Sequence, residues 1–234
     1  MRVGRRGFSL LEVAIIIAVI VLLFSLMMAA ASSARAQSRC VTCMSNMRQI
    51  SEAAFAYAEA NGGKVYPCDC LLAQVALPDA NQAADIPALT AFTGDRRVFH
   101  CVDDPRDGCR SYSINDHVGG TYPTMKHVSD IQLITNAATT FLFIEETPPA
   151  TRNGFTGGFV VLPYPSERWA DAPSVVHPRG TCLSFADGHC EFWQWVDPRT
   201  AKLSPFIQYP RTQDNPDLVR LQRASAGGPI PPQH

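Results

Sequence analysis

The sequence predicts an α+β protein in which one long N-terminal helix packs its second half on a small antiparallel β-sheet. Two observations predict the helix. Residues 13–31 are apolar except for Ser25, and apolar residues then recur at spacings of three and four until Asn61-Gly62-Gly63, a typical helix stop. A third observation predicts the sheet, because short β-branched, aromatic or alternating runs follow, separated by many prolines and glycines.

The expected helix runs from about Phe8 to Ala60. Residues 13–31 would be about 28 Å long as a helix, close to the ~30 Å hydrocarbon thickness of a bilayer, so residues 8–31 are predicted to span a membrane. Three arginines in residues 1–7 favour a cytoplasmic N-terminus. Residues 32–61 are the predicted amphipathic continuation, with an apolar stripe formed by Val41, Met44, Met47, Ile50, Ala54, Phe55 and Ala58.

Glu12 is unexpected near the start of this apolar helix. A carboxylate costs about 2.5–3.5 kcal/mol near the bilayer centre, and less near the interface. If the chain is cut between Gly7 and Phe8, Phe8 acquires an α-amino group that can neutralise Glu12 of a neighbouring copy. Glu12 would then fix the register of a bundle of identical helices.

The stretch Gly7-Phe8-Ser9-Leu10-Leu11-Glu12, after a short basic leader, resembles the processing motif of type IV pilins and of the pseudopilins of type II secretion. This resemblance covers about sixty residues and implies a pilin-like fold, cleavage after Gly7 by prepilin peptidase, and N-methylation of Phe8. It also implies an inner-membrane protein with a single span, whose C-terminal domain is periplasmic or extracellular. Two alternatives are a secretory signal peptide ending at Ala34-Arg35-Ala36 and an anchor that is never cut.

Residues 62–203 are predicted to form the β-rich globular domain. Strands are expected at 111–115, 139–144 and 157–162, and a hairpin is expected around Asp187-Gly188. We predict a two-residue type I′ turn, which places Phe185 opposite Cys190 and Leu183 opposite Phe192. Residues 204–234 are predicted to be a Pro-rich tail that is flexible or draped over the surface.

The eight cysteines favour disulfides in an exported protein. The candidates in the globular domain are Cys68, Cys70, Cys101, Cys109, Cys182 and Cys190, and a Cys101–Cys109 bridge is one expectation. Sequence alone leaves the connectivity open, because six cysteines allow fifteen pairings. Cys40 and Cys43 lie three apart on the helix, which suits a redox or metal pair, two small buried residues, or partners of a domain cysteine.

A second motif, His177 followed after nine residues by Asp187-Gly188, resembles the H-x9-DG motif near the C-terminus of a large group of prepilin-like proteins. With His100-Cys101 and Ser111–Asn115, this resemblance extends over about residues 5–195. One interpretation is a divalent-metal site of His177, Asp187 and His189. The favoured interpretation is structural, with Asp187 holding the turn and His177 bonding free backbone groups, so no cofactor is expected.

Three further groups have both a chemical and a structural interpretation. Asp103, Asp104 and Asp107 suit a calcium site or a solvated turn. The pair Glu145-Glu146 suits acid–base catalysis or a charged strand end, and Trp193 with Trp195 suits a ligand platform or the cover of the sheet. In each case the structural interpretation is the prediction.

The charge balance excludes a basic nucleic-acid-binding surface, because 20 Lys and Arg face 21 Asp and Glu. The sequence contains neither a Gly-rich phosphate loop nor a G-x-S-x-G motif, and we do not expect an enzyme. The predicted function is a subunit of a type IV pilus or of a type II secretion pseudopilus-like filament, with prepilin peptidase and other pilin or pseudopilin subunits as partners. The alternatives are a membrane-anchored extracytoplasmic binding module and an exported metal-dependent enzyme.

Overall fold

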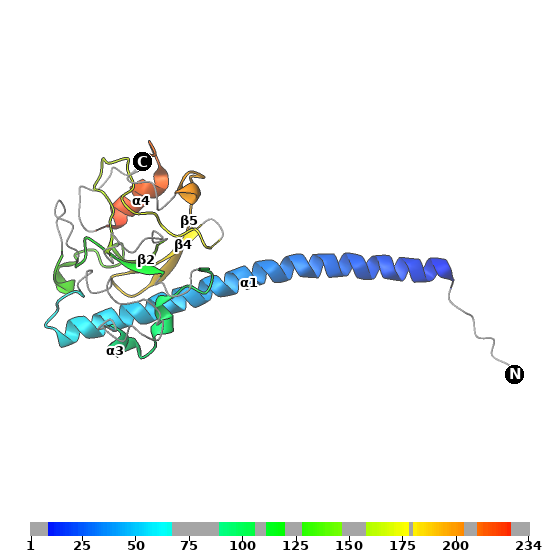
Figure 1. Cartoon of the computed structure of the whole chain (residues 1–234), viewed down its shortest axis with the longest axis horizontal. Coiled ribbons are helices and arrows are strands. Elements are labelled where there is room, and N and C mark those ends of the chain that lie inside the picture. Colours follow the sequence, from blue (N-terminus) through cyan, green and yellow to red (C-terminus); the bar gives the residue numbers. More distant parts are fainter. Residues whose placement is uncertain are drawn as a thin grey trace, which may run out of the picture. The chain divides into compact units, whose positions relative to one another are not determined.

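The computed structural model describes residues 9–66, 89–105, 111–119, 128–146, 158–177, 180–203 and 210–225. The chain divides into two compact units, Met1–Arg39 and Cys40–His234. Helix α1, Leu10–Ala60, contributes residues to both units (Figure 1). The predicted long helix is therefore confirmed from Leu10 onward, whereas Gly7 and Phe8 lie outside the described residues.

Both ends of α1 have local hydrogen bonds or backbone angles that explain why the helix starts and stops there. At the start, Ser9 Oγ accepts from the Glu12 backbone N–H at 3.2 Å, and Glu12 Oε2 accepts from the Ser9 N–H at 2.7 Å. This reciprocal pair is a capping box. At the end, Gly62 and Gly63 have positive φ angles of 65° and 87°, which confirms the predicted glycine stop.

The first unit contains the segment Leu10–Met28, 19 residues that are long and apolar enough to cross a membrane. None of this segment is buried within the structure. Phe24 and Leu26, for example, are 63% and 62% exposed. A single membrane span is therefore compatible with the fold of this unit.

The second unit is built on a five-stranded sheet of order β3-β1-β2-β4-β5. The strands are β1 Tyr112–Asn115, β2 Phe141–Glu145, β3 Gly158–Phe159, β4 Gly180–Phe185 and β5 Cys190–Gln194. Because β3 pairs with β1 in parallel while the other pairs are antiparallel, the predicted purely antiparallel sheet is wrong. β2 already pairs with β1 and β4 on its two sides, so β3 joins the sheet at the free edge of β1.

Short helices complete the described part of the domain: α3 Thr90–Thr93, the 3-10 helices η1 Arg96–Phe99, η2 Ile131–Leu133 and η3 Thr200–Lys202, and α4 Pro216–Ala224. The residues of α1 from Cys40 onward cover one face of the sheet and α4 covers the other (Figure 1). Most of the predicted apolar stripe of α1 is buried or half-buried, but Val41 is 55% exposed. Cys43 is buried instead, because two residues along a helix turn a side chain to nearly the opposite side.

The hairpin between β4 and β5 has a longer turn than predicted. Phe185 N–H donates to the His189 carbonyl and Gly188 N–H donates to the Phe185 carbonyl, both at 2.9 Å, with Gly188 at φ 93°. This is a three-residue turn with a glycine bulge, not a two-residue type I′ turn. The register moves by one residue, so Cys182 pairs with Phe192 and Leu183 with Glu191. With this register Cys190 lies opposite Ser184, so Cys182 and Cys190 share the sheet face that α1 covers.

Part of the predicted flexible tail is a packed helix. The Asn215 side chain accepts from the Asp217 and Leu218 N–H groups at the start of α4. Leu218 and Leu221 are buried in one cluster with Trp193. The tail prediction is therefore wrong for residues 216–224, which form one of the two layers that cover the sheet.

Candidate functional site

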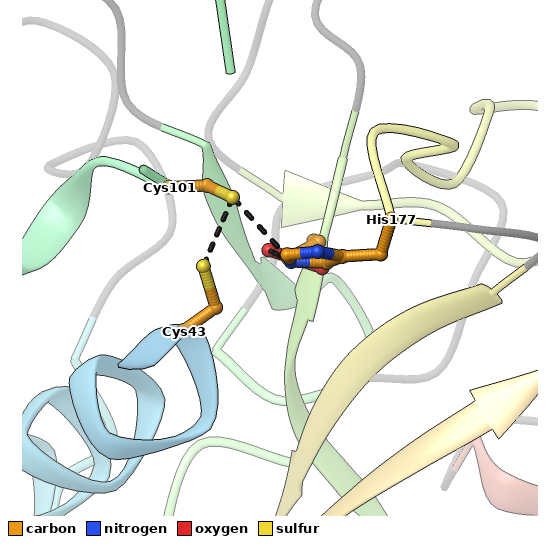
Figure 2. A group of neighbouring side chains, drawn as sticks. Cys43, Cys101 and His177 are labelled. Atoms are coloured by element: carbon orange, nitrogen blue, oxygen red, sulfur yellow. Dashed lines mark hydrogen bonds and ion pairs between the residues drawn. The ribbon is translucent and has the colours of Figure 1, made fainter. Parts of the chain in front are cut away.

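Four buried side chains with metal-binding or nucleophilic atoms converge in the domain: Cys43, Cys101, Glu145 and His177. One ligand atom of each lies within 4.8 Å of the ligand atoms of the others. Figure 2 shows the Cys43 and Cys101 side chains pointing toward each other, with the His177 ring beside Cys101. We call this set of four residues the buried thiol cluster.

The four residues come from four separate parts of the fold. Cys43 lies on the buried face of α1, and Glu145 is the last residue of β2. Cys101 follows η1, whose Val98 and Phe99 are buried, and the Cys101 N–H donates to Ser111 Oγ at 3.0 Å. His177 precedes β4 and forms a bridge with Gly180. Tertiary packing thus assembles a site whose members are far apart in sequence.

The distances inside the cluster are short. The two sulfurs of Cys43 and Cys101 are 2.9 Å apart, and Cys101 Sγ is 3.5 Å from His177 Nε2. His177 Nε2 is also 3.1 Å from Glu145 Oε1. On the other side of the ring, Nδ1 is 3.1 Å from Asp103 Oδ2, although these two atoms are not aligned for a hydrogen bond.

These contacts shift the protonation of the cluster. The hydrogen bond between the two sulfurs, together with His177, lowers the pKa of Cys43 to about 6 against the opposing effect of burial. The same sulfur contact, with burial, raises the pKa of Cys101. Burial acts to lower the pKa of His177, but the Cys43 sulfur and Glu145 outweigh it and raise that pKa to about 11. The reduced cluster therefore favours a Cys43 thiolate beside a His177 imidazolium.

A second cysteine pair lies next to the cluster. Cys40 Sγ is 3.6 Å from Cys182 Sγ, and burial raises the pKa of both thiols. The two cysteines of the helix thus face two different domain cysteines, which is one of the three predicted arrangements. All five described cysteines, Cys40, Cys43, Cys101, Cys182 and Cys190, are free thiols in this structure, so the predicted disulfides are not formed among the described residues.

The structure separates the three residues of the predicted H-x9-DG metal site. Asp187 and His189 meet in the hairpin turn, where His189 Nδ1 is 2.5 Å from Asp187 Oδ1. His177 precedes the other end of β4, a six-residue strand that spans about 20 Å. His177, Asp187 and His189 therefore cannot hold one ion. The favoured prediction that His177 bonds free backbone groups is also wrong, because its ring contacts the side chains of Cys101, Glu145 and Asp103.

Three further groups had a structural interpretation as their prediction, and the structure agrees with only part of it. Trp193 and Trp195 are 5% and 6% exposed, so they cover the sheet and are not a surface platform. The solvated Asp103-Asp104 turn is wrong, since Asp104 is buried and accepts from Ser111 Oγ. Glu145 and Glu146 lie at the end of β2 as predicted, but both side chains are buried. Asp107, Cys68, Cys70 and Cys109 lie outside the described residues.

Comparison of the chain with protein-family models, curated proteins and solved structures finds no match. The long helix and the buried thiol cluster are therefore interpreted from their own geometry and chemistry.

Proposed function

We propose that this chain is a membrane-anchored, pilin-like subunit that is cut after Gly7 and assembles into a type IV pilus or type II secretion pseudopilus-like filament. The observation that supports this best is the composition of α1. One continuous helix of 51 residues begins as an exposed apolar segment and ends as part of a domain core. Prepilin peptidase and other pilin or pseudopilin subunits are the proposed partners.

The exposed segment requires an apolar environment. Its large hydrophobic side chains include Val13, Leu22 and Met28, which are 43%, 60% and 66% exposed, and burying such surface is worth about 25 cal/mol per Å². A bilayer supplies that environment for a single subunit. A bundle of the same segments from several subunits supplies it in a filament.

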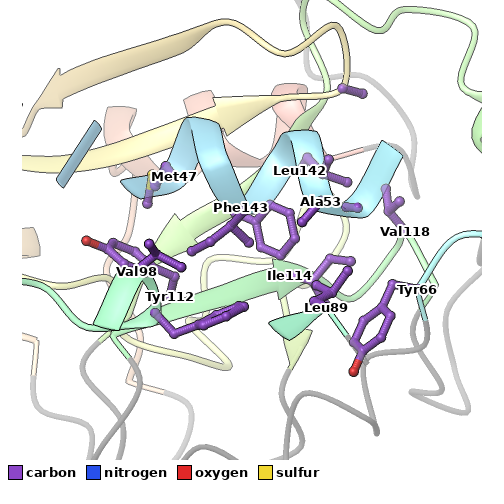
Figure 3. Packing of buried hydrophobic residues seen from close by; sticks show 14 of the residues in the cluster. Met47, Ala53, Tyr66, Leu89, Val98, Tyr112, Ile114, Val118, Leu142 and Phe143 are labelled. Carbon is purple, nitrogen blue, oxygen red and sulfur yellow. The ribbon is translucent and has the colours of Figure 1, made fainter. Parts of the chain in front are cut away.

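The second half of α1 is fixed to the domain by its side chains. Met47 and Ala53 from the helix pack on Tyr112, Ile114 and Phe143 of the sheet (Figure 3). Ser51 Oγ also donates to Ser184 Oγ of β4 at 2.8 Å, and both residues are buried. This half of the helix is thus an integral part of the domain core, as a subunit that assembles through its helix requires.

The capping box gives Glu12 a role even in an isolated chain, because its carboxylate satisfies the Ser9 N–H. Helix capping and pairing with the Phe8 amine of a neighbour require different properties of the side chain at position 12. Capping needs only an acceptor oxygen, which glutamine also has. Pairing with an ammonium group depends on the negative charge.

The test compares Glu12→Gln, Glu12→Ala and Ser9→Ala in cells that contain the prepilin peptidase and assembly machinery. We expect both Glu12 variants to insert in the membrane and to lose filament assembly at least about tenfold, which corresponds to about 1.4 kcal/mol or more. Ser9→Ala removes one half of the capping box and keeps the charge, so it should still assemble. Wild-type assembly by Glu12→Gln would refute the charge-pairing role.

Neither alternative function has support of this kind. The binding module depended on exposed tryptophans, and Trp193 and Trp195 are buried. The metal-dependent enzyme depended on His177, Asp187 and His189, which do not converge in the structure.

A further inference from the structure

We propose that the buried thiol cluster is a structural zinc site, with Cys43 Sγ, Cys101 Sγ, His177 Nε2 and a Glu145 carboxylate oxygen as the four ligands. The converging atoms are two sulfurs, one imidazole nitrogen and one carboxylate oxygen. Zn²⁺ binds all three atom types and takes four ligands in structural sites. The assignment goes beyond the filament function and does not depend on it.

The distances suit four ligands around one small ion. With usual zinc bond lengths, ligand atoms in a tetrahedral site lie about 3.8 Å apart for two sulfurs, about 3.5 Å for sulfur and nitrogen, and about 3.3 Å for nitrogen and oxygen. Cys101 Sγ to His177 Nε2 is 3.5 Å, and His177 Nε2 to Glu145 Oε1 is 3.1 Å. The two sulfurs, 2.9 Å apart, need to separate by about 1 Å, which a rotation of roughly 30° about χ1 of Cys43, or smaller rotations of both cysteines, would supply.

A disulfide between Cys43 and Cys101 is the main competing arrangement. It would require the sulfurs to approach from 2.9 Å to about 2.05 Å. It would also use only two of the four converging groups. His177 and Glu145 would remain buried against a neutral bond, whereas a divalent cation uses every member of the cluster.

Residues next to the four proposed ligands contact the ligand side chains on the sides that face away from the ion position. Asp103 Oδ2 lies 3.1 Å from His177 Nδ1, the ring nitrogen that does not point into the cluster, although the two atoms are not aligned for a hydrogen bond. A ligating histidine commonly donates its second N–H to such a carboxylate, and a small change in the Asp103 side chain would align the pair. Glu145 Oε2 accepts from the Cys182 N–H at 3.1 Å, and the Asp103 N–H donates to Cys101 Sγ at 3.4 Å. These two hydrogen bonds leave Glu145 Oε1 and the other lone pairs of Cys101 Sγ available to an ion.

Complete burial makes the role structural rather than catalytic. Cys43, Cys101, Glu145 and His177 are each 0% exposed, so the site has no open position for a substrate. An ion there would offset the negative charge of the thiolates and carboxylate, which is costly to bury alone. It would also join α1, the segment after η1, β2 and the segment before β4 at one point.

The test uses the full chain, purified in detergent from the membrane without chelators, and analysed by elemental mass spectrometry. We expect one zinc ion per chain, and tetrahedral thiolate–cobalt absorption bands after replacement with Co²⁺. Cys43→Ser and His177→Ala should each lower bound zinc at least about tenfold, and Asp103→Asn should weaken zinc affinity about 10- to 100-fold. Cys190→Ser is the matched control, since Cys190 lies in the hairpin outside the cluster, and it should retain zinc.

Three results would overturn the assignment. The first is a wild-type protein without stoichiometric metal, in which peptide mapping finds Cys43 joined to Cys101 and the mass is lower by two hydrogens. The second is full zinc retention by Cys43→Ser. The third is a cobalt-loaded wild-type protein without thiolate bands, a measurement that needs no variant and so does not depend on a variant's folding.

Discussion

The substitution Leu221→Ala tests whether α4 is part of the domain core. Leu221 is fully buried in the cluster that also contains Leu218, Phe185 and Trp193. Removing most of a buried leucine side chain costs its transfer free energy plus a cavity term, together about 2–5 kcal/mol. In a domain of this size each kcal/mol lowers the melting temperature by roughly 2–4 °C. We therefore expect a decrease of about 4–20 °C.

Tryptophan fluorescence during heating of the detergent-purified chain is the appropriate assay. All three tryptophans, Trp169, Trp193 and Trp195, belong to the same buried cluster as Leu221, so the signal reports on that cluster. The control is Arg223→Ala, an exposed position on the same helix, which should shift the free energy of unfolding by less than about 1 kcal/mol. Equal melting of Leu221→Ala and the control would refute the packing of α4.

Two further substitutions test other parts of the fold with the same assay. Ile50→Ala should lower the free energy of unfolding by about 2–5 kcal/mol, because Ile50 is fully buried. Val41→Ala should lower it by less than about 1 kcal/mol, because Val41 is 55% exposed. Equal losses in the two variants would contradict the observed buried face of α1. Gly188→Ala should cost about 1–2 kcal/mol, because Gly188 has φ 93° and only glycine adopts that conformation without strain; an unchanged melting temperature would contradict the bulged turn.

The sequence predicts well the features that depend on interactions between residues close together in the chain. The apolar run, its amphipathic continuation and the glycine stop each act within a few residues, and α1 ends where they predict. The central strands are similar, because β2 is a short β-branched and aromatic run. Asp187-Gly188 correctly predicts a turn but not its length, since the same dipeptide suits a type I′ turn and a bulged three-residue turn.

Two features outside the prediction, the helix α4 and the start of α1, have local causes in the sequence. The prolines of residues 204–234 predict a tail, but a proline in the first turn of a helix is favourable, and Asn215 just before Pro216 is the start signal of α4. The capping box formed by Ser9 and Glu12 is likewise a local signal, an S-x-x-E pattern before an apolar run.

The buried thiol cluster was not predictable from spacing. Its members come from four segments, and the sequence predicts Glu145 only as a charged strand end. His177 was correctly selected as a residue of interest, but its partners are determined by the register of β4 and the rotation of α1. One of the predicted interpretations of Cys43, a partner of a domain cysteine, agrees with its contact with Cys101, but nothing in the sequence indicates which cysteine.

The most direct test of the proposed function is the intact mass and N-terminal sequence of the protein from membranes that contain prepilin peptidase. We expect a mature chain that starts at Phe8, with or without one methyl group on its amine. A chain that starts at Met1, or one that starts near Gln37 after signal-peptide cleavage, would contradict the pilin-like pathway.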